Sequence, residues 1–139
     1  RMIPALLDAY RERVLSLGSA LRFNTTPEEY HQMRVCCKRM RYAMEFFTSC
    51  YGDRLQSLIR IMIDVQDNLG RVHDADVQLA SVRGYIKKKH SKASKRRHLE
   101  GELEPLIDSE VCTKQDSLSE FHRSWPESRS ELEGIDFSL

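Results

Sequence analysis

Hydrophobic residues recur at intervals of three and four along the first part of the chain, as they do on one face of an α-helix. They are Ile3, Leu6, Leu7, Tyr10, Val14, Leu17 and Leu21. We therefore expect a first helix that ends near Arg22. A second helix is expected from Thr26 to about Cys50, because Thr26 suits the N-cap and Pro27 suits the first helical position. Gly52 follows as a stop signal.

The next hydrophobic stretches predict three more helices. Residues 53–69 have a broad apolar face, and Gly70 is expected to end this third helix. Asp74 is expected to cap a fourth helix with a narrower apolar stripe. A fifth helix is expected to run to about Trp125, with a kink or restart at Pro105. The pattern predicts an all-α fold, an antiparallel bundle of about five helices.

Charge is distributed unevenly along the chain, although the formal net charge is only +1. Residues 1–98 carry 19 of the 22 Lys and Arg and 10 of the 21 Asp and Glu, a net of +9; residues 99–139 carry 3 and 11, a net of −8. We predict one helical domain over 1–125. The acidic segment 126–139 lacks helical apolar spacing, and we expect it to be partly disordered. We hypothesise that it folds over the cationic surface.

Cysteine use and hydropathy indicate the compartment. The four cysteines show no metal-type CxxC spacing, and adjacent Cys36 and Cys37 are poorly placed for an ordinary disulfide. No apolar run approaches the roughly 20 residues of a membrane span. We therefore predict reduced thiols in a cytoplasmic protein. Because the chain opens on Arg1 rather than methionine, we expect it to be a piece of a longer protein.

The second predicted helix has a cationic face. At about 100° per residue, five side chains of residues 31–42 fall within an arc of about 100°. They are His31, Arg34, Lys38, Arg41 and Tyr42, and we call them the cationic stripe. No carboxylate occurs from His31 to Arg41, so the like charges repel one another and an anionic partner would relieve the repulsion. Arginine, lysine and histidine all suit phosphate, although an ordinary solvated helix face is the alternative.

Two stretches of the sequence resemble the CHAD domains (conserved histidine α-helical domains). HQMRVCCKRMRYAMEFF is similar to the family's pattern of a histidine, an arginine three residues later, a Lys-Arg pair and Arg-Tyr. VQDNLGRVHDADV is similar to a later helix-turn-helix, with Gln-Asp, Leu-Gly and Asp74. The resemblance covers residues 28–80 and is strongest to the second of the two internal repeats of such domains. Since we find no first-repeat copy, the chain looks like half of a two-bundle domain.

The resemblance implies two related helical bundles with a basic groove between them, and binding of inorganic polyphosphate. By that resemblance, the positions of the family's basic helix are occupied by His31, Arg34, Lys38, Arg39, Arg41 and Tyr42. Arg39 lies off the stripe and would serve the rim or a neighbouring bundle. A homodimer or the missing first repeat would have to complete the groove. Lys87 and Lys88, which begin a cationic stretch, are expected at its edge.

Other motifs carry weaker signals. His73 and Asp74 resemble the metal ligands of HD-type phosphohydrolases, but Asp74 is explained as a helix cap. Residues 66–68, Gln-Asp-Asn, would order a turn or hold arginines of the stripe. No phosphate loop or nucleophile elbow is present, so we predict a non-enzymatic module without a metal or cofactor site. The eight Lys and Arg of residues 83–97 favour the alternative of a nucleic-acid-binding or helical assembly domain, although only Tyr85 there is aromatic.

Overall fold

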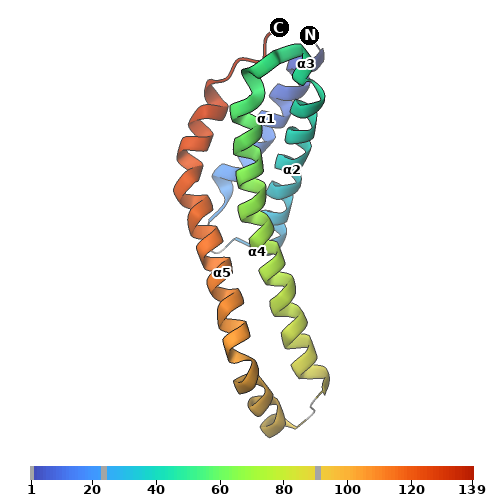
Figure 1. Cartoon of the computed structure of the whole chain (residues 1–139), viewed down its shortest axis with the longest axis vertical. Helices are drawn as coiled ribbons and strands as arrows, with labels where there is room; N and C mark the ends of the chain where they lie inside the picture. Colours follow the sequence, from blue (N-terminus) through green and yellow to red (C-terminus); the bar gives the residue numbers. More distant parts are fainter. Residues whose placement is uncertain (1, 23–24, 90–91) are drawn as a thin grey trace.

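The chain folds into an all-α antiparallel bundle, as the hydrophobic periodicity predicts (Figure 1). The computed structural model describes residues 2–22, 25–89 and 92–139. The described residues form four long helices, and two short helical turns connect the second of these with the third. The elements are α1 (Met2–Ala20), α2 (Pro27–Phe46), α3 (Thr48–Tyr51), the 3-10 helix η1 (Gly52–Leu55), α4 (Gln56–Lys89) and α5 (Ala93–Gly134).

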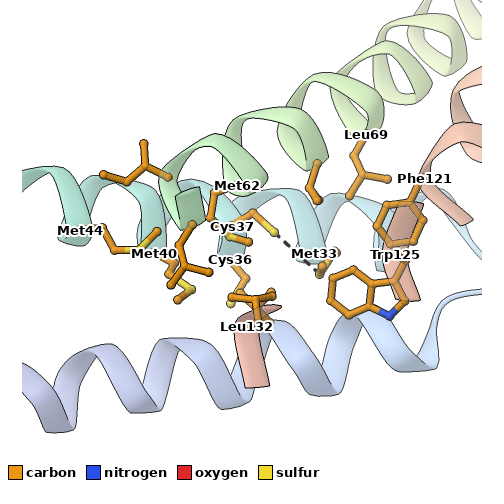
Figure 2. Packing of buried hydrophobic residues seen from close by; sticks show 14 of the residues in the cluster. Met33, Cys36, Cys37, Met40, Met44, Met62, Leu69, Phe121, Trp125 and Leu132 are labelled. Carbon is orange, nitrogen blue, oxygen red and sulfur yellow. Dashed lines mark hydrogen bonds between the residues drawn. The ribbon is translucent and has the colours of Figure 1, made fainter. Parts of the chain in front are cut away.

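The core is formed by the inward faces of α1, α2, α4 and α5 (Figure 2). Helix α2 contributes several sulfur-containing side chains, including the fully buried Met33, Cys37 and Met40. All four cysteines are free thiols, and burial raises the pKa of Cys37. This thiol therefore stays protonated and packs as a small apolar side chain. In the described part of the chain, no helix is long and apolar enough to cross a membrane.

The start of α2 confirms the predicted cap. The Thr26 hydroxyl accepts a hydrogen bond from the Glu29 backbone N–H at 3.3 Å, and the same hydroxyl donates to the Glu29 carboxylate at 3.1 Å. Pro27 occupies the first turn, where its missing N–H leaves no bond unmade. Near the other end, Gly52 adopts φ +60° and ends α3 rather than α2, which stops at Phe46.

We expect Thr26→Ala to lower the free energy of unfolding by about 1 kcal/mol, because it leaves a helix N–H without its acceptor. Thr26→Ser keeps the acceptor oxygen and serves as the matched control. Urea unfolding followed by circular dichroism measures both variants. Equal stability of the alanine and serine variants would contradict the role of the cap.

Helix α4 is a single helix of 34 residues, so the predicted stop at Gly70 and cap at Asp74 are wrong. Its buried positions continue across the glycine without a break in helical spacing: Leu69, Val72, Ala75 and Leu79 are all at most 5% exposed. A glycine inside a helix costs about 1 kcal/mol relative to alanine. Packing on both sides of Gly70 outweighs that cost.

Helix α5 also continues past its expected limits. It includes both Pro105 and Pro126 and ends at Gly134, where we expected a helix end near residue 125 and partial disorder over 126–139. Leu132 is fully buried and Phe137 is 2% exposed, so this segment contributes to the core. The apolar spacing does not predict that residues 126–139 pack on the core, because their buried residues are few and widely spaced among acidic ones.

Helices α4 and α5 extend together beyond α1 and α2 as a two-helix hairpin (Figure 1). We call residues 76–89 and 92–114 the arm. At its base, the Lys114 ammonium lies 2.7 Å from the Asp76 carboxylate. The cationic stretch from Lys87 to Arg97 contains the end of α4 and the start of α5, while residues 90–91 lie outside the described residues.

Candidate functional site

Helices α2 and α4 lie antiparallel, and two contacts fix their register. The rings of His31 and His73 stack with centroids 5.5 Å apart. Three residues further along α2, the Arg34 Nε lies 3.6 Å from the position that a Cβ on Gly70 would occupy. Because both helices rise 1.5 Å per residue, this register brings Lys38 to the level of Gln66. The stripe of α2 therefore runs along α4.

An open groove lies between these two helices. Its volume is about 300 Å³, and its lining consists of Arg34, Gln66, Asp67, Gly70, Arg71 and Asp74. The lack of a side chain at Gly70 leaves room for the Arg34 guanidinium. The groove is thus a polar site in which a cation of α2 faces amide, carboxylate and guanidinium groups of α4. We call it the α2–α4 groove.

The stripe continues from the groove around an aromatic side chain. Tyr42 is 50% exposed, with the Lys38 ammonium 5.8 Å and the Arg41 guanidinium 4.9 Å from its ring centroid. Arg41 also lies 3.7 Å from Glu45. Its Nε is buried and has no hydrogen-bond partner among the described residues. Attraction of both cations to the π face of Tyr42 partly compensates for the repulsion between Lys38 and Arg41.

The family of the chain follows from comparison with known proteins. The model of the CHAD domain family matches residues 1–83 of the 139, which is more than half of the chain. This chain belongs to the CHAD domain family. No curated protein and no solved structure matches it. CHAD domains are binding modules known for binding polyphosphate.

The part of the chain that matches the CHAD model contains the whole α2–α4 groove. It extends from α1 through α2 into α4 and ends at Arg83. The matched part also contains all five residues of the cationic stripe: His31, Arg34, Lys38, Arg41 and Tyr42. The distal half of the arm and all of α5 lie beyond it.

Arg39 is separated from the other CHAD-pattern residues, as its position on the helical wheel predicts. Its charge and that of Arg13 on α1 act on the Cys36 thiol. Burial raises the pKa of Cys36, and the two arginines oppose that increase. Arg39 is exposed and does not line the α2–α4 groove.

Lys87 and Lys88 are exposed on the arm, away from the stripe. Lys87 follows His73 by 14 residues in the same continuous helix, a separation of about 20 Å along its axis. The structure therefore does not bring these lysines together with His31 and Arg34. The two sets of cations form separate surfaces.

The sequence predicts the wall that α4 contributes only in part. Residues 66–68 are expected at the end of a third helix, to order a turn or to hold arginines of the stripe, and two of them line the groove together with Arg34. His73 and Asp74 are expected as a helix start or a weak metal motif. Taken as one helix, however, Gln66, Gly70 and His73 lie within about 60° of one another on the wheel. This helical periodicity is the signal in the sequence that indicates one continuous wall. In the described part of the chain, no three His, Cys, Asp or Glu side chains come together as metal ligands would.

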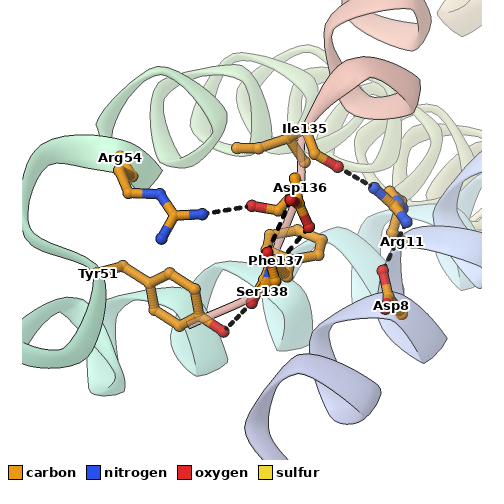
Figure 3. Close-up of polar contacts among 8 residues, drawn as sticks. All are labelled: Asp8, Arg11, Tyr51, Arg54, Ile135, Asp136, Phe137 and Ser138. Atoms are coloured by element: carbon orange, nitrogen blue, oxygen red, sulfur yellow. Dashed lines mark hydrogen bonds and ion pairs between the residues drawn. The ribbon is translucent and has the colours of Figure 1, made fainter. Parts of the chain in front are cut away.

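The C-terminal segment is bound elsewhere, contrary to the hypothesis that it covers the cationic surface (Figure 3). The Tyr51 hydroxyl donates to the Phe137 carbonyl at 2.7 Å, and the Arg54 guanidinium donates to the Asp136 carbonyl at 2.6 Å. Arg11 of α1 donates to the Ile135 carbonyl. These contacts join the segment to α1, α3 and η1, whereas the α2–α4 groove is lined by other residues.

Proposed function

We propose that this CHAD chain binds inorganic polyphosphate without catalysing a reaction, along the α2–α4 groove and the neighbouring cationic stripe. The observation that carries the proposal is that two cations of α2 have no anionic partner among the described residues. Neither Arg34 nor Lys38 has an ion pair with another described residue, although Arg34 lines a groove and Lys38 is exposed beside it. Their charges are therefore available to an external anion.

The side chains around the groove suit a chain of phosphates. The Arg34 guanidinium is a planar fork for phosphate oxygens, and Lys38 supplies a mobile point charge. His31 and His73 add hydrogen-bond donors at one end of the stripe. The Asp67 and Asp74 carboxylates on the α4 side repel a polyanion, so the polymer is expected to lie over α2 rather than over α4.

Tyr42 favours polyphosphate over nucleic acid. Recognition of single-stranded nucleic acid uses aromatic faces on which bases stack. Here the Lys38 ammonium and the Arg41 guanidinium lie against the Tyr42 ring. A ring already engaged by two cations is a poor platform for a base, whereas the same two cations can bind phosphate.

A groove with a second basic wall would bind the polymer more tightly than one helix face. In this proposal that wall comes from a first repeat or from a second copy of the chain. Lys87 and Lys88 would contact only a polymer long enough to reach the arm. A cytoplasmic location of the protein stays a prediction.

The test is a titration of long-chain polyphosphate into the full chain at low and high salt. Lys38→Glu is expected to weaken binding about tenfold or more in low salt, because it replaces an attraction to phosphate with a repulsion. Arg129→Glu on α5 is the matched control, since it changes the net charge equally on an exposed residue already adjacent to Glu133. Its affinity is expected to stay close to that of the wild type.

Salt and competition distinguish the outcomes. The affinity of the wild type is expected to fall as salt rises, because phosphate contacts release counterions. Absence of binding in low salt, or equal binding by Lys38→Glu and the wild type, would contradict the proposed site. Displacement of polyphosphate by duplex DNA or RNA at equal phosphate concentration would favour the nucleic-acid alternative.

A further inference from the structure

The arm carries two blocks of opposite charge. Residues 83–89 and 92–97 contain eight Lys and Arg and no Asp or Glu, and we call them the basic tip. Residues 99–110 contain five Asp and Glu and no Lys or Arg, and we call them the acidic shaft. Blocks of a single sign are unusual on a solvated helix, which normally mixes charges. The arm therefore has two surfaces that complement each other.

Several charged side chains of both blocks are exposed to solvent. Lys92 and Lys95 of the basic tip are exposed, as are Glu104 and Asp108 of the acidic shaft. Among the described residues, none of these four side chains forms an ion pair. Glu102 of the shaft lies 3.1 Å from His98, one turn earlier in the same helix.

The arm also leaves apolar surface uncovered. Two helices bury only the sides that face each other, and here Val77 is 53%, Tyr85 51% and Leu106 44% exposed. A groove of about 720 Å³ runs between the helices, with both apolar and charged residues in its lining. They include Ile86 and Ile107 together with Lys87 and Glu104. A second pair of helices would cover this surface.

We propose that the arm pairs with the arm of a second copy of this chain, antiparallel, so that each basic tip lies against the acidic shaft of the other copy. The centres of tip and shaft are about ten residues apart on α5, or about 15 Å. A two-fold axis midway between them passes near Gly101 and forms both contacts at once. Nothing lies within 4 Å of the Cβ position at Gly101, so a partner helix can approach closely there.

The acidic shaft is the reason to prefer a second copy over a polyanion on the arm. A polyphosphate or nucleic acid bound to the tip would extend along carboxylates that repel it. A second arm offers positive charge to the shaft and negative charge to the tip simultaneously. This pairing does not depend on the proposed polyphosphate site.

Sedimentation equilibrium of the full chain tests the proposal in the absence of polyphosphate. The wild type is expected to dimerise in low salt and to dissociate as salt screens the charges. Introducing the opposite charge at two exposed positions of the tip, with Lys92→Glu and Lys95→Glu, or of the shaft, with Glu104→Lys and Asp108→Lys, is expected to weaken the dimer about tenfold or more. Circular dichroism checks that both variants keep their helical content.

Mixing the two variants is the decisive experiment. In each variant alone the substituted positions meet like charges in both contacts, whereas in one copy of each variant the substituted positions carry opposite charges and attract. The mixture is therefore expected to form a heterodimer with an affinity near that of the wild-type dimer. Monomeric wild type in low salt, unaffected dimers in the single variants, or no recovery on mixing would each overturn the proposal. Loss of polyphosphate affinity in the tip variant without any dimer would also overturn it and would assign the tip to polyanion binding.

Discussion

Replacing Phe137 with alanine is expected to lower the free energy of unfolding by about 3–5 kcal/mol. The phenyl ring is 2% exposed and meets the Tyr51 ring edge-on, with centroids 6.4 Å apart. The Arg11 guanidinium lies 5.1 Å from the centroid of the same ring. Truncation removes these contacts and leaves a cavity between the C-terminal segment, α1 and α3.

Backbone hydrogen bonds make the effect larger than the loss of one side chain alone. The carbonyls of residues 135, 136 and 137 accept from Arg11, Arg54 and Tyr51, respectively. The Ser138 N–H and hydroxyl donate to the Asp136 carboxylate at 2.9 and 2.7 Å and turn the segment toward α3 (Figure 3). Without the Phe137 anchor, the cost of ordering this segment is no longer offset.

Phe46→Ala is the matched control, because the same ring is removed from a site that is 79% exposed. Its unfolding free energy is expected to stay within about 0.5 kcal/mol of the wild type. Urea unfolding followed by circular dichroism measures both variants. If Phe137→Ala and Phe46→Ala had equally small effects, the C-terminal segment would not be anchored to the bundle.

The fold was predictable where short-range signals decide the structure. The spacing of apolar residues in α1 and the cap at Thr26 rest on neighbours within one or two turns, and the structure confirms both. The break at Gly70 was wrong because packing of Val72 and Ala75 against the bundle exceeds the local preference of glycine. Local propensity carries no information about such long-range contacts.

The same limit applies to the candidate site and to the C-terminal segment. The cationic face of α2 was predictable from one helix, since His31, Arg34 and Lys38 share a side. Its partner His73 was not, because an assumed break at Gly70 destroyed the register between α2 and α4. Burial of Phe137 depends on Tyr51, which is 86 residues away in sequence.

Gly18→Ala is expected to destabilise the protein by about 1–3 kcal/mol, although alanine is the better helix former. Gly18 is buried in α1, and a Cβ there would lie 2.2 and 2.4 Å from two ring carbons of Trp125. The indole cannot simply move aside, because it stacks on Phe121 with centroids 5.6 Å apart and is itself 6% exposed. The added methyl group must therefore displace α1 from α5.

Gly84→Ala gives the control with the opposite sign. Gly84 also lies inside a helix, but nothing lies within 4 Å of its Cβ position. Alanine there is expected to stabilise the protein by up to about 1 kcal/mol, since it only reduces the conformational freedom lost on folding. Thermal and urea unfolding compare the two substitutions. The same sign of change at both positions would contradict a steric role for Gly18.

A double-mutant cycle with Trp125→Leu isolates the contact between these two residues. Leucine removes the ring atoms that the Gly18 methyl group would meet, so Gly18→Ala is expected to cost less in that background than in the wild type. Trp125→Leu alone is destabilising because it opens a cavity beside Phe121. The positive coupling between the two substitutions, rather than either single loss, measures how closely α1 and α5 approach. Additive losses would mean that Gly18 acts through the α1 backbone and not through the indole.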